Sequence, residues 1–265
     1  MSKNILLTGA SGGMGLETAK YLISQGYEVY GLDIRPVQEI EHLHFYQCDI
    51  TNEESVIEAF NKVKEEAKEI NAFIHLAGIY DLNSLVEMSE KDWMRIFNIN
   101  VFGVYRINKI FLPILAKGGK IIITSSELAP LDPLPFNGIY AISKSALDKY
   151  AYSLRMELQL LGYQVIVIRP GAVDTDMINI SNLQIEKFVN ETTTYKEISK
   201  KFKQIVESVE ARKIPPERIA LLVSKVLKKK NPKYIYKITR NPLLMMMNIL
   251  PKRWQNKLIK RILSK

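Results

Sequence analysis

The chain has 265 residues, of which 47% are hydrophobic, and its formal net charge is +9. This length and apolar content suffice for one domain with a substantial core. The charge is unevenly placed. Fourteen of the 37 Lys and Arg follow Glu217, the last acidic residue, so residues 1–217 hold the other 23 together with all 28 carboxylates and carry a net charge of −5. An acidic body and a tail without a base-reading motif argue against a nucleic-acid partner.

Several classes of protein are disfavoured by residues that are scarce or missing. No apolar stretch is long enough to predict a membrane-spanning helix. Cys48 is the only cysteine, which rules out an internal disulfide, and residues 1–5 have no signal-peptide pattern, so we expect a cytoplasmic location. His42, His44 and His75 have no familiar metal-ligand spacing, and we expect no metal site.

Short apolar runs, typical of buried strands, alternate with amphipathic stretches typical of helices. In chain order the pattern predicts strands at 5–7, 28–32, 44–47, 72–76, 120–124, 165–168 and 234–238, and helices at 14–25, 53–69, 92–116, 139–161 and from Pro215 onward. The helix at 92–116 is expected to break near Gly103 and to end around Pro113. The alternation predicts an α/β fold: a single Rossmann-like, doubly wound parallel sheet of about seven strands, flanked by helices, with its ligand crevice at the carboxyl ends of the strands.

Two segments depart from this alternation. Residues 174–213 are polar and helical in character, and we predict a lid or substrate region within a catalytic domain of residues 1–240. Residues 241–265 predict a basic, amphipathic C-terminal helical extension that contains Trp254. Such a helix fits peripheral contact with an anionic membrane surface, and it fits equally a helix that packs on the domain or on a subunit partner.

The segment YAISK places Tyr140 and Lys144 four residues apart within a predicted helix, and therefore on one face of it. A lysine charge so close favours the tyrosinate, which would lower the tyrosine pKa from about 10 and make the phenol a usable acid or base. Such pairs also occur by chance in helices. Ser126, upstream, offers a hydroxyl for the same site.

The segment TGASGGMG, residues 8–15, follows the first predicted strand and opens the first helix. Glycines at this point let the backbone turn tightly and approach a pyrophosphate, which a helix N-terminus attracts. Asp33 ends the second predicted strand, where a carboxylate accepts hydrogen bonds from ribose hydroxyls and favours NAD over NADP. Arg35 leaves NADP possible.

These segments together resemble the short-chain dehydrogenase/reductase family. Residues 8–15 are similar to its T-G-x-x-x-G-x-G motif, residues 140–144 to its Y-x-x-x-K signature, and residues 170–175, PGAVDT, to its P-G-x-V-x-T segment. The matches run in family order from residue 8 to residue 175. The resemblance implies a catalytic set and a cofactor-binding set: catalytic Asn100, Ser126, Tyr140 and Lys144; cofactor-binding Gly9, Ser11, Gly13, Met14, Gly15, Asp33, Asp49, Ala77, Gly78, Tyr140, Lys144, Pro170, Gly171, Val173 and Thr175.

The resemblance also implies an activity, namely hydride transfer between NAD, or possibly NADP, and a secondary alcohol or ketone. Tyr140 would transfer the proton, Ser126 would hydrogen-bond the substrate oxygen, Lys144 would hold the nicotinamide ribose, and Asn100 would support a water-linked proton path. Homodimers or homotetramers are typical of the family. The alternative is a non-catalytic dinucleotide-binding regulator that senses redox state, against which the joint presence of the serine, tyrosine and lysine argues.

One departure from the family pattern follows the fourth predicted strand. The family usually has N-N-A-G there, whereas this chain reads His75-Leu76-Ala77-Gly78. We expect altered local hydrogen bonding around the histidine, with activity retained.

The substrate side of the site is predicted to be apolar. Leu128, Leu131, Leu134, Phe136 and Met177 are candidates for a wall above the nicotinamide, which favours a lipophilic alcohol or ketone.

Overall fold

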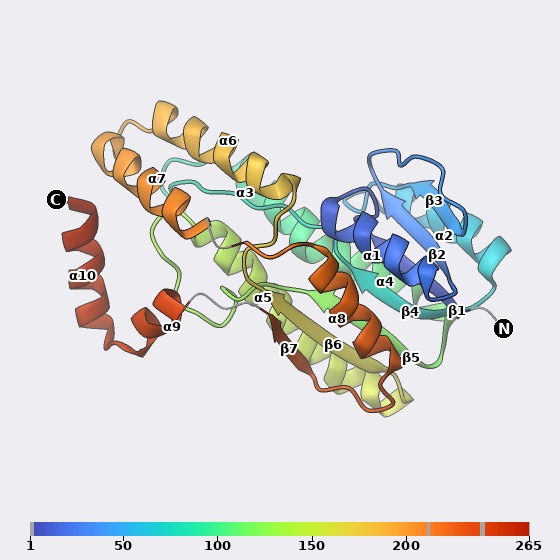
Figure 1. Cartoon of the computed structure of the whole chain (residues 1–265). Helices are drawn as coiled ribbons and strands as arrows, with labels where there is room; N and C mark the ends of the chain where they lie inside the picture. Colours follow the sequence, from blue (N-terminus) through green and yellow to red (C-terminus); the bar gives the residue numbers. More distant parts are fainter. Residues whose placement is uncertain (1–2, 211–212, 239–241, 265) are drawn as a thin grey trace.

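A parallel sheet forms the centre of the protein, with helices on both faces (Figure 1). The computed structural model describes residues 3–210, 213–238 and 242–264, and within them the sheet has seven strands in the order β3-β2-β1-β4-β5-β6-β7. This confirms the predicted Rossmann-like class. The strands are β1 (Lys3–Thr8), β2 (Tyr27–Asp33), β3 (Leu43–Gln47), β4 (Ile70–His75), β5 (Leu115–Thr124), β6 (Gln164–Pro170) and β7 (Ile235–Ile238).

The helices divide between the two faces of the sheet according to the hydrophobic cores they join. Helices α2 (Glu53–Ala67), α4 (Val104–Phe111) and α5 (Gly138–Leu158) contribute to one core, and α1 (Gly13–Ser24) and α8 (Glu217–Lys228) to the other. The central strands supply both cores: in β5, Ile121 and Ile123 face the first core and Ile122 faces the second. Burial on both faces explains why these strands are continuously apolar.

The helical region predicted at 92–116 differs in detail. It is made of α3 (Glu90–Phe97), a π-helical segment (Asn98–Gly103), α4 and a short 3-10 turn (Leu112–Ile114). The predicted break near Gly103 is therefore wrong, because the chain stays helical there with a wider turn. A Cβ at Gly103 would lie 2.6 Å from Ile50 Cδ1, so the glycine serves close packing.

The predicted lid region folds into α6 (Asp176–Glu191) and α7 (Lys196–Glu210), which pack together (Figure 1). Glu87 fixes the turn between them, since its carboxylate accepts hydrogen bonds from Thr192 Oγ1 at 2.6 Å and from the backbone N–H of Thr194 at 2.9 Å. The C-terminal helices α9 (Pro242–Ile249) and α10 (Lys252–Ser264) follow, and α10 contacts α7.

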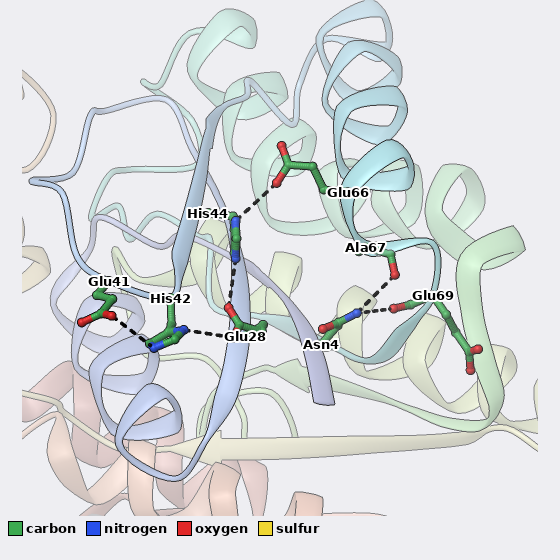
Figure 2. Close-up of polar contacts among 8 residues, drawn as sticks. All are labelled: Asn4, Glu28, Glu41, His42, His44, Glu66, Ala67 and Glu69. Atoms are coloured by element: carbon green, nitrogen blue, oxygen red, sulfur yellow. Dashed lines mark hydrogen bonds and ion pairs between the residues drawn. The ribbon is translucent and has the colours of Figure 1, made fainter. Parts of the chain in front are cut away.

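The outer edge of the sheet carries a polar network away from the crevice (Figure 2). Glu28, near the start of β2, lies 3.0 Å from His42 Nδ1 and 3.0 Å from His44 Nε2, and His44 Nδ1 lies 3.3 Å from a carboxylate oxygen of Glu66 on α2. The two imidazoles lower the pKa of Glu28. Asn4 similarly joins β1 to the end of α2 through its side-chain amide. The histidine contacts attach the edge strand β3 to β2 and α2.

Candidate active site

A pocket with a cavity volume of about 210 Å³ lies at the carboxyl ends of the central strands. Its lining comes from the N-terminus of α1, from the segments at the ends of β4, β5 and β6, and from α5, α7 and α9. Among the described residues the lining is Met14, Leu76, Gly78, Ile79, Tyr80, Thr124, Ser125, Ser126, Glu127, Leu128, Leu134, Asn137, Tyr140, Lys144, Pro170, Gly171, Ala172, Val173, Thr175, Phe202, Ile205, Val206 and Leu244.

Ser126, Tyr140 and Lys144 all line this pocket. The Lys144 ammonium lies 5.7 Å from the centre of the Tyr140 ring and donates a hydrogen bond to the carbonyl of Thr124 at 3.2 Å. The Ser126 hydroxyl is hydrogen-bonded to the Tyr140 phenol, and all three side chains are buried. The helix α5 and the end of β5 thus bring a hydroxyl, a phenol and a cation to one place.

The electrostatics of the pair differ from the sequence-based expectation. Burial raises the pKa of Tyr140 to about 12, although the hydrogen bond from Ser126 opposes the rise. Burial also lowers the pKa of Lys144 to about 8 against the attraction of Asp148. The expected lowering of the tyrosine pKa is wrong for this chain, because burial destabilises the phenolate more than the neighbouring groups stabilise it. Near neutral pH the phenol therefore holds its proton and the lysine remains mainly cationic.

Asn100 lies fully buried in the π-helical segment and braces the back of the site. Its Oδ1 accepts a hydrogen bond from the backbone N–H of Ile79 at 2.9 Å, and its Nδ2 donates to the Ile79 carbonyl at 3.0 Å and to Ser143 Oγ at 3.1 Å. A Cβ at Gly78 would lie 3.2 Å from Asn100 Oδ1 and 3.4 Å from Lys144 Nζ. Asn100 and the lysine therefore both border Gly78, and π-helical turns often occur at such sites.

His75 replaces the family asparagine with a different brace. Its Nε2 lies 2.9 Å from Asn108 Oδ1, and Asn108 Nδ2 donates to the Tyr150 hydroxyl at 3.1 Å. The chain of contacts joins β4 to α4 and α5. His75 Nδ1 is buried and has no partner among the described residues.

The glycine-rich turn has the shape required of a pyrophosphate cradle. Gly9 has a φ of +77°, and a Cβ on it would lie 2.6 Å from the Ala77 nitrogen. A Cβ on Gly15 would lie 1.9 Å from the Gly9 carbonyl oxygen, and one on Gly13 would lie 2.9 Å from Thr175 Cγ2. The turn thus packs closely on the backbone at Ala77 and on the side chain of Thr175, with the N-terminus of α1 beside it, which fits a bound dinucleotide.

Asp33 lies beside this turn, as a ribose-binding carboxylate requires. Its two oxygens accept hydrogen bonds from the backbone N–H groups of Ser11 at 3.1 Å and Arg35 at 3.0 Å. The Ser11 hydroxyl is buried without a partner among the described residues, which offers a polar group to a ligand. Asp49 instead bonds locally, since its Oδ1 accepts from the Thr51 N–H at 2.8 Å.

The substrate side of the pocket is only partly the wall that the sequence predicted. Leu128 and Leu134 line it, whereas Phe136 packs behind it in an aromatic cluster with Phe188, Tyr195 and Phe202. Leu131 is not among the described lining residues, and the side chain of Met177 lies outside the described residues.

The opposite wall was missed by the sequence reasoning. Phe202, Ile205 and Val206 of α7 and Leu244 of α9 form much of it. The i, i+3, i+4 spacing in α7 marks an apolar face, but an apolar face does not indicate which surface it covers.

Neither a metal-binding cluster nor a membrane-spanning helix is found in the described part of the chain. Within residues 3–210, 213–238 and 242–264, no three His, Cys, Asp or Glu side chains gather as a metal would require. No helix of that part of the chain is both long and apolar enough to span a bilayer.

A doubly wound parallel sheet, a glycine cradle and a Ser-Tyr-Lys cluster at its carboxyl edge define a dinucleotide-dependent oxidoreductase site. The family model for short chain dehydrogenases matches residues 3–186, and the chain belongs to the short-chain dehydrogenase/reductase family. It is an NAD(P)-dependent oxidoreductase.

The chain is also similar to individual proteins over most of its length. A 3-ketodihydrosphingosine reductase of Bacteroides thetaiotaomicron is 29% identical over 252 residues, which cover 94% of this chain and 92% of that relative. A probable short-chain type dehydrogenase/reductase of Helicobacter pylori is 26% identical over 97% of this chain and 96% of its own length. A short chain dehydrogenase from Burkholderia cenocepacia, solved in complex with NADP, shares the fold with a TM-score of 0.74 and 22% identity, covering 100% of this chain and 98% of that one.

Proposed function

We propose that the protein transfers a hydride between a nicotinamide cofactor and a lipophilic ketone or secondary alcohol, with Tyr140 as the acid or base. The observation that carries the proposal is the pocket itself. Ser126, Tyr140 and Lys144 line it together with the apolar side chains of α7 and α9 and with Leu128 and Leu134 of the segment after β5. A largely apolar pocket that also holds a hydroxyl, a phenol and a cation suits a molecule with a reactive oxygen on a hydrophobic body.

Each polar group then has a role in the reaction. When bound, the nicotinamide cofactor supplies or accepts the hydride. Ser126 donates a hydrogen bond to the substrate oxygen and stabilises the charge that develops there. The protonated phenol of Tyr140 gives its proton to that oxygen during reduction, and Lys144, cationic at neutral pH, stabilises the resulting phenolate. Asn100 holds the backbone of residue 79 and the Ser143 hydroxyl, and so positions this end of the site.

The cofactor-holding residues are the glycine turn, Asp33, Gly78 and the segment 170–175. Asp33 lies against the turn with both oxygens directed to backbone N–H groups. A carboxylate in this position accepts ribose hydroxyls and repels a 2′-phosphate, and for that reason we propose NAD as the preferred cofactor. Dissociation constants for NADH and NADPH, measured side by side, test this preference, and tighter binding of NADPH would contradict it.

The substrate class is supported by one relative as well as by the pocket. The Bacteroides thetaiotaomicron relative that covers 94% of this chain is named for the reduction of 3-ketodihydrosphingosine. We propose a keto lipid or a similarly apolar ketone as the substrate of this chain. A panel of lipophilic and sugar-like ketones and alcohols, assayed by the absorbance of NADH, would distinguish these classes.

The decisive experiment on the mechanism is Tyr140→Phe. The substitution keeps the ring and removes only the proton-carrying hydroxyl, so turnover should fall by about 10²- to 10⁴-fold while NADH affinity changes little. Tyr150→Phe is the matched control, because that phenol bonds Asn108 outside the pocket. Turnover of Tyr140→Phe near that of the unsubstituted chain would remove Tyr140 from the mechanism.

The alternative function, the oligomeric state and the location are tested separately. A non-catalytic redox sensor would bind NADH without turning over any member of the panel. Homodimers or homotetramers are proposed from the family resemblance, and sedimentation measures them. A cytoplasmic location with contact at a membrane surface is also proposed, supported by the basic tail.

A further inference from the structure

The two C-terminal helices expose an apolar surface bordered by cations. The exposed fraction is 52% for Leu243, 59% for Met246 and 82% for Ile249 on α9, and 68% for Trp254 on α10. We propose that α9 and α10 dock the enzyme on an anionic lipid surface and place the mouth of the substrate pocket next to it. Docking is independent of the reaction, whereas delivery of substrate from the lipid rests on the proposed function.

Three adjacent rows of side chains at i, i+4 spacing run along helix α10. Gln255, Ile259 and Leu263 form the most buried row, and Leu263 packs on the cluster that contains Phe202 of α7. Trp254, Leu258 and Ile262 form an exposed apolar row, and Arg253, Lys257 and Arg261 form an exposed cationic row beside it. An apolar row flanked by cations, with a tryptophan near one end, is the pattern of a helix that lies in a membrane interface.

Helix α9 connects this surface to the pocket. Leu244 lines the pocket and Met247 is buried, while Leu243, Met246 and Ile249 face outward. One helix therefore separates the substrate cavity from the exposed apolar surface. A lipid lying against the outer face would be within one helix diameter, about 10 Å, of the cavity wall.

The extension is fastened to the body, so its outer surface has a fixed direction. The Asp132 backbone N–H donates to Asn248 Oδ1 at 2.6 Å, and the Asp132 carboxylate forms an ion pair with Lys252. Figure 1 shows α9 and α10 on the same side of the molecule as α6 and α7. The sequence predicted either packing on the domain or contact with a membrane for this tail. In the structure one face of the tail packs on the domain, and the opposite face is exposed and can contact a membrane.

Charge favours an anionic bilayer over a second copy of the chain. Residues 242–264 contain no carboxylate, and Lys252, Arg253, Lys257, Lys260 and Arg261 are all exposed. A two-fold contact through this surface would oppose cations to cations, which is unfavourable. Anionic headgroups would neutralise them while the apolar row entered the acyl boundary.

The test is co-sedimentation of the full chain with vesicles of phosphatidylcholine alone or with added phosphatidylglycerol. The variant Arg253→Gln/Lys257→Gln/Arg261→Gln removes the cationic row. Its matched control, Lys62→Gln/Lys117→Gln/Lys149→Gln, removes the same charge from exposed positions elsewhere. We expect binding to the anionic vesicles only, weakened at least about tenfold in the first variant and in high salt but little changed in the control. In a Trp93→Phe background, the fluorescence of Trp254 should shift to the blue on binding.

Equal binding to both vesicle types, no binding to either, or equal loss in the two triple variants would overturn the docking proposal. A change of molar mass with the tail variant, without vesicle binding, would assign the surface to a second copy instead. Delivery is tested separately with a ketone held in anionic vesicles and with a water-soluble one. The tail variant should lose rate on the first and keep it on the second, and equal rates on both would refute delivery. If no ketone is turned over by any variant, the proposed function fails, while sedimentation still decides docking.

Discussion

Replacing His75 by glutamine should make the protein more resistant to acid. The imidazole is 2% exposed, its Nε2 lies against Asn108 Oδ1, and its Nδ1 has no partner among the described residues. A proton added at Nδ1 would therefore sit in an apolar environment without a hydrogen-bond acceptor. Burial accordingly lowers the pKa of His75 from 6.5 to about 4.

The sign and size of the effect follow from these two values. Between about pH 4 and pH 6.5 the unfolded chain binds a proton at this histidine and the folded chain does not, so acid favours unfolding. This contribution to stability is complete above pH 6.5 and is lost progressively as the pH falls toward 4. One pKa unit corresponds to about 1.4 kcal/mol, so the loss from pH 6.5 to pH 5 is about 2 kcal/mol.

The assay is urea unfolding at pH 7, 6 and 5, followed by circular dichroism. His75→Gln keeps a donor for Asn108 but has no titrating group. Between pH 7 and pH 5 the free energy of unfolding should therefore decrease in the variant by about 2 kcal/mol less than it does in the unsubstituted chain. Tyr150→Phe is the control: it weakens the same network and keeps the histidine, so it should retain the acid sensitivity. Parallel pH profiles for His75→Gln and the unsubstituted chain would show that burial of His75 does not govern acid stability.

Three other substitutions test the glycine cradle, the Asp33 carboxylate and the turn between α6 and α7. Gly15→Ala should lower the free energy of unfolding by about 1–3 kcal/mol and abolish NADH binding, because the new Cβ would lie 1.9 Å from the Gly9 carbonyl oxygen. Urea unfolding measures the first effect and calorimetry the second. Retained NADH affinity would contradict the packing argument. Asp33→Asn should shift the ratio of NADH to NADPH affinity by about tenfold, or about 1.4 kcal/mol, toward NADPH, and an unchanged ratio would remove Asp33 from cofactor selection. Glu87→Gln should accelerate hydrogen exchange in the turn around Thr192, because the Glu87 carboxylate accepts the hydrogen bonds that hold the turn. The same hydrogen bonds lower the pKa of Glu87 to about 2. Unchanged exchange in the turn would show that other contacts hold it.

Much of the fold could be predicted because its determinants are local. Short apolar runs located the strands and period-3.6 patterns located most helices, and the turn at residues 8–15 requires glycine for reasons visible in the sequence. The helix around Asn100 was predicted with a break, because a glycine in a helical pattern reads as an interruption. In the structure Gly103 instead makes room for Ile50, a contact that depends on a segment distant in sequence.

The site shows the same division between local and distant determinants. The sequence by itself determined the dinucleotide-binding class, the glycine cradle and the order of Ser126, Tyr140 and Lys144, because each depends on spacing within one element or one turn. Only the tertiary structure decided the sign of the Tyr140 pKa shift, the α7 and α9 wall of the pocket, and which face of α10 stays exposed. Each of these depends on how much water distant segments exclude, and that is set by packing between elements rather than by the order of residues within one.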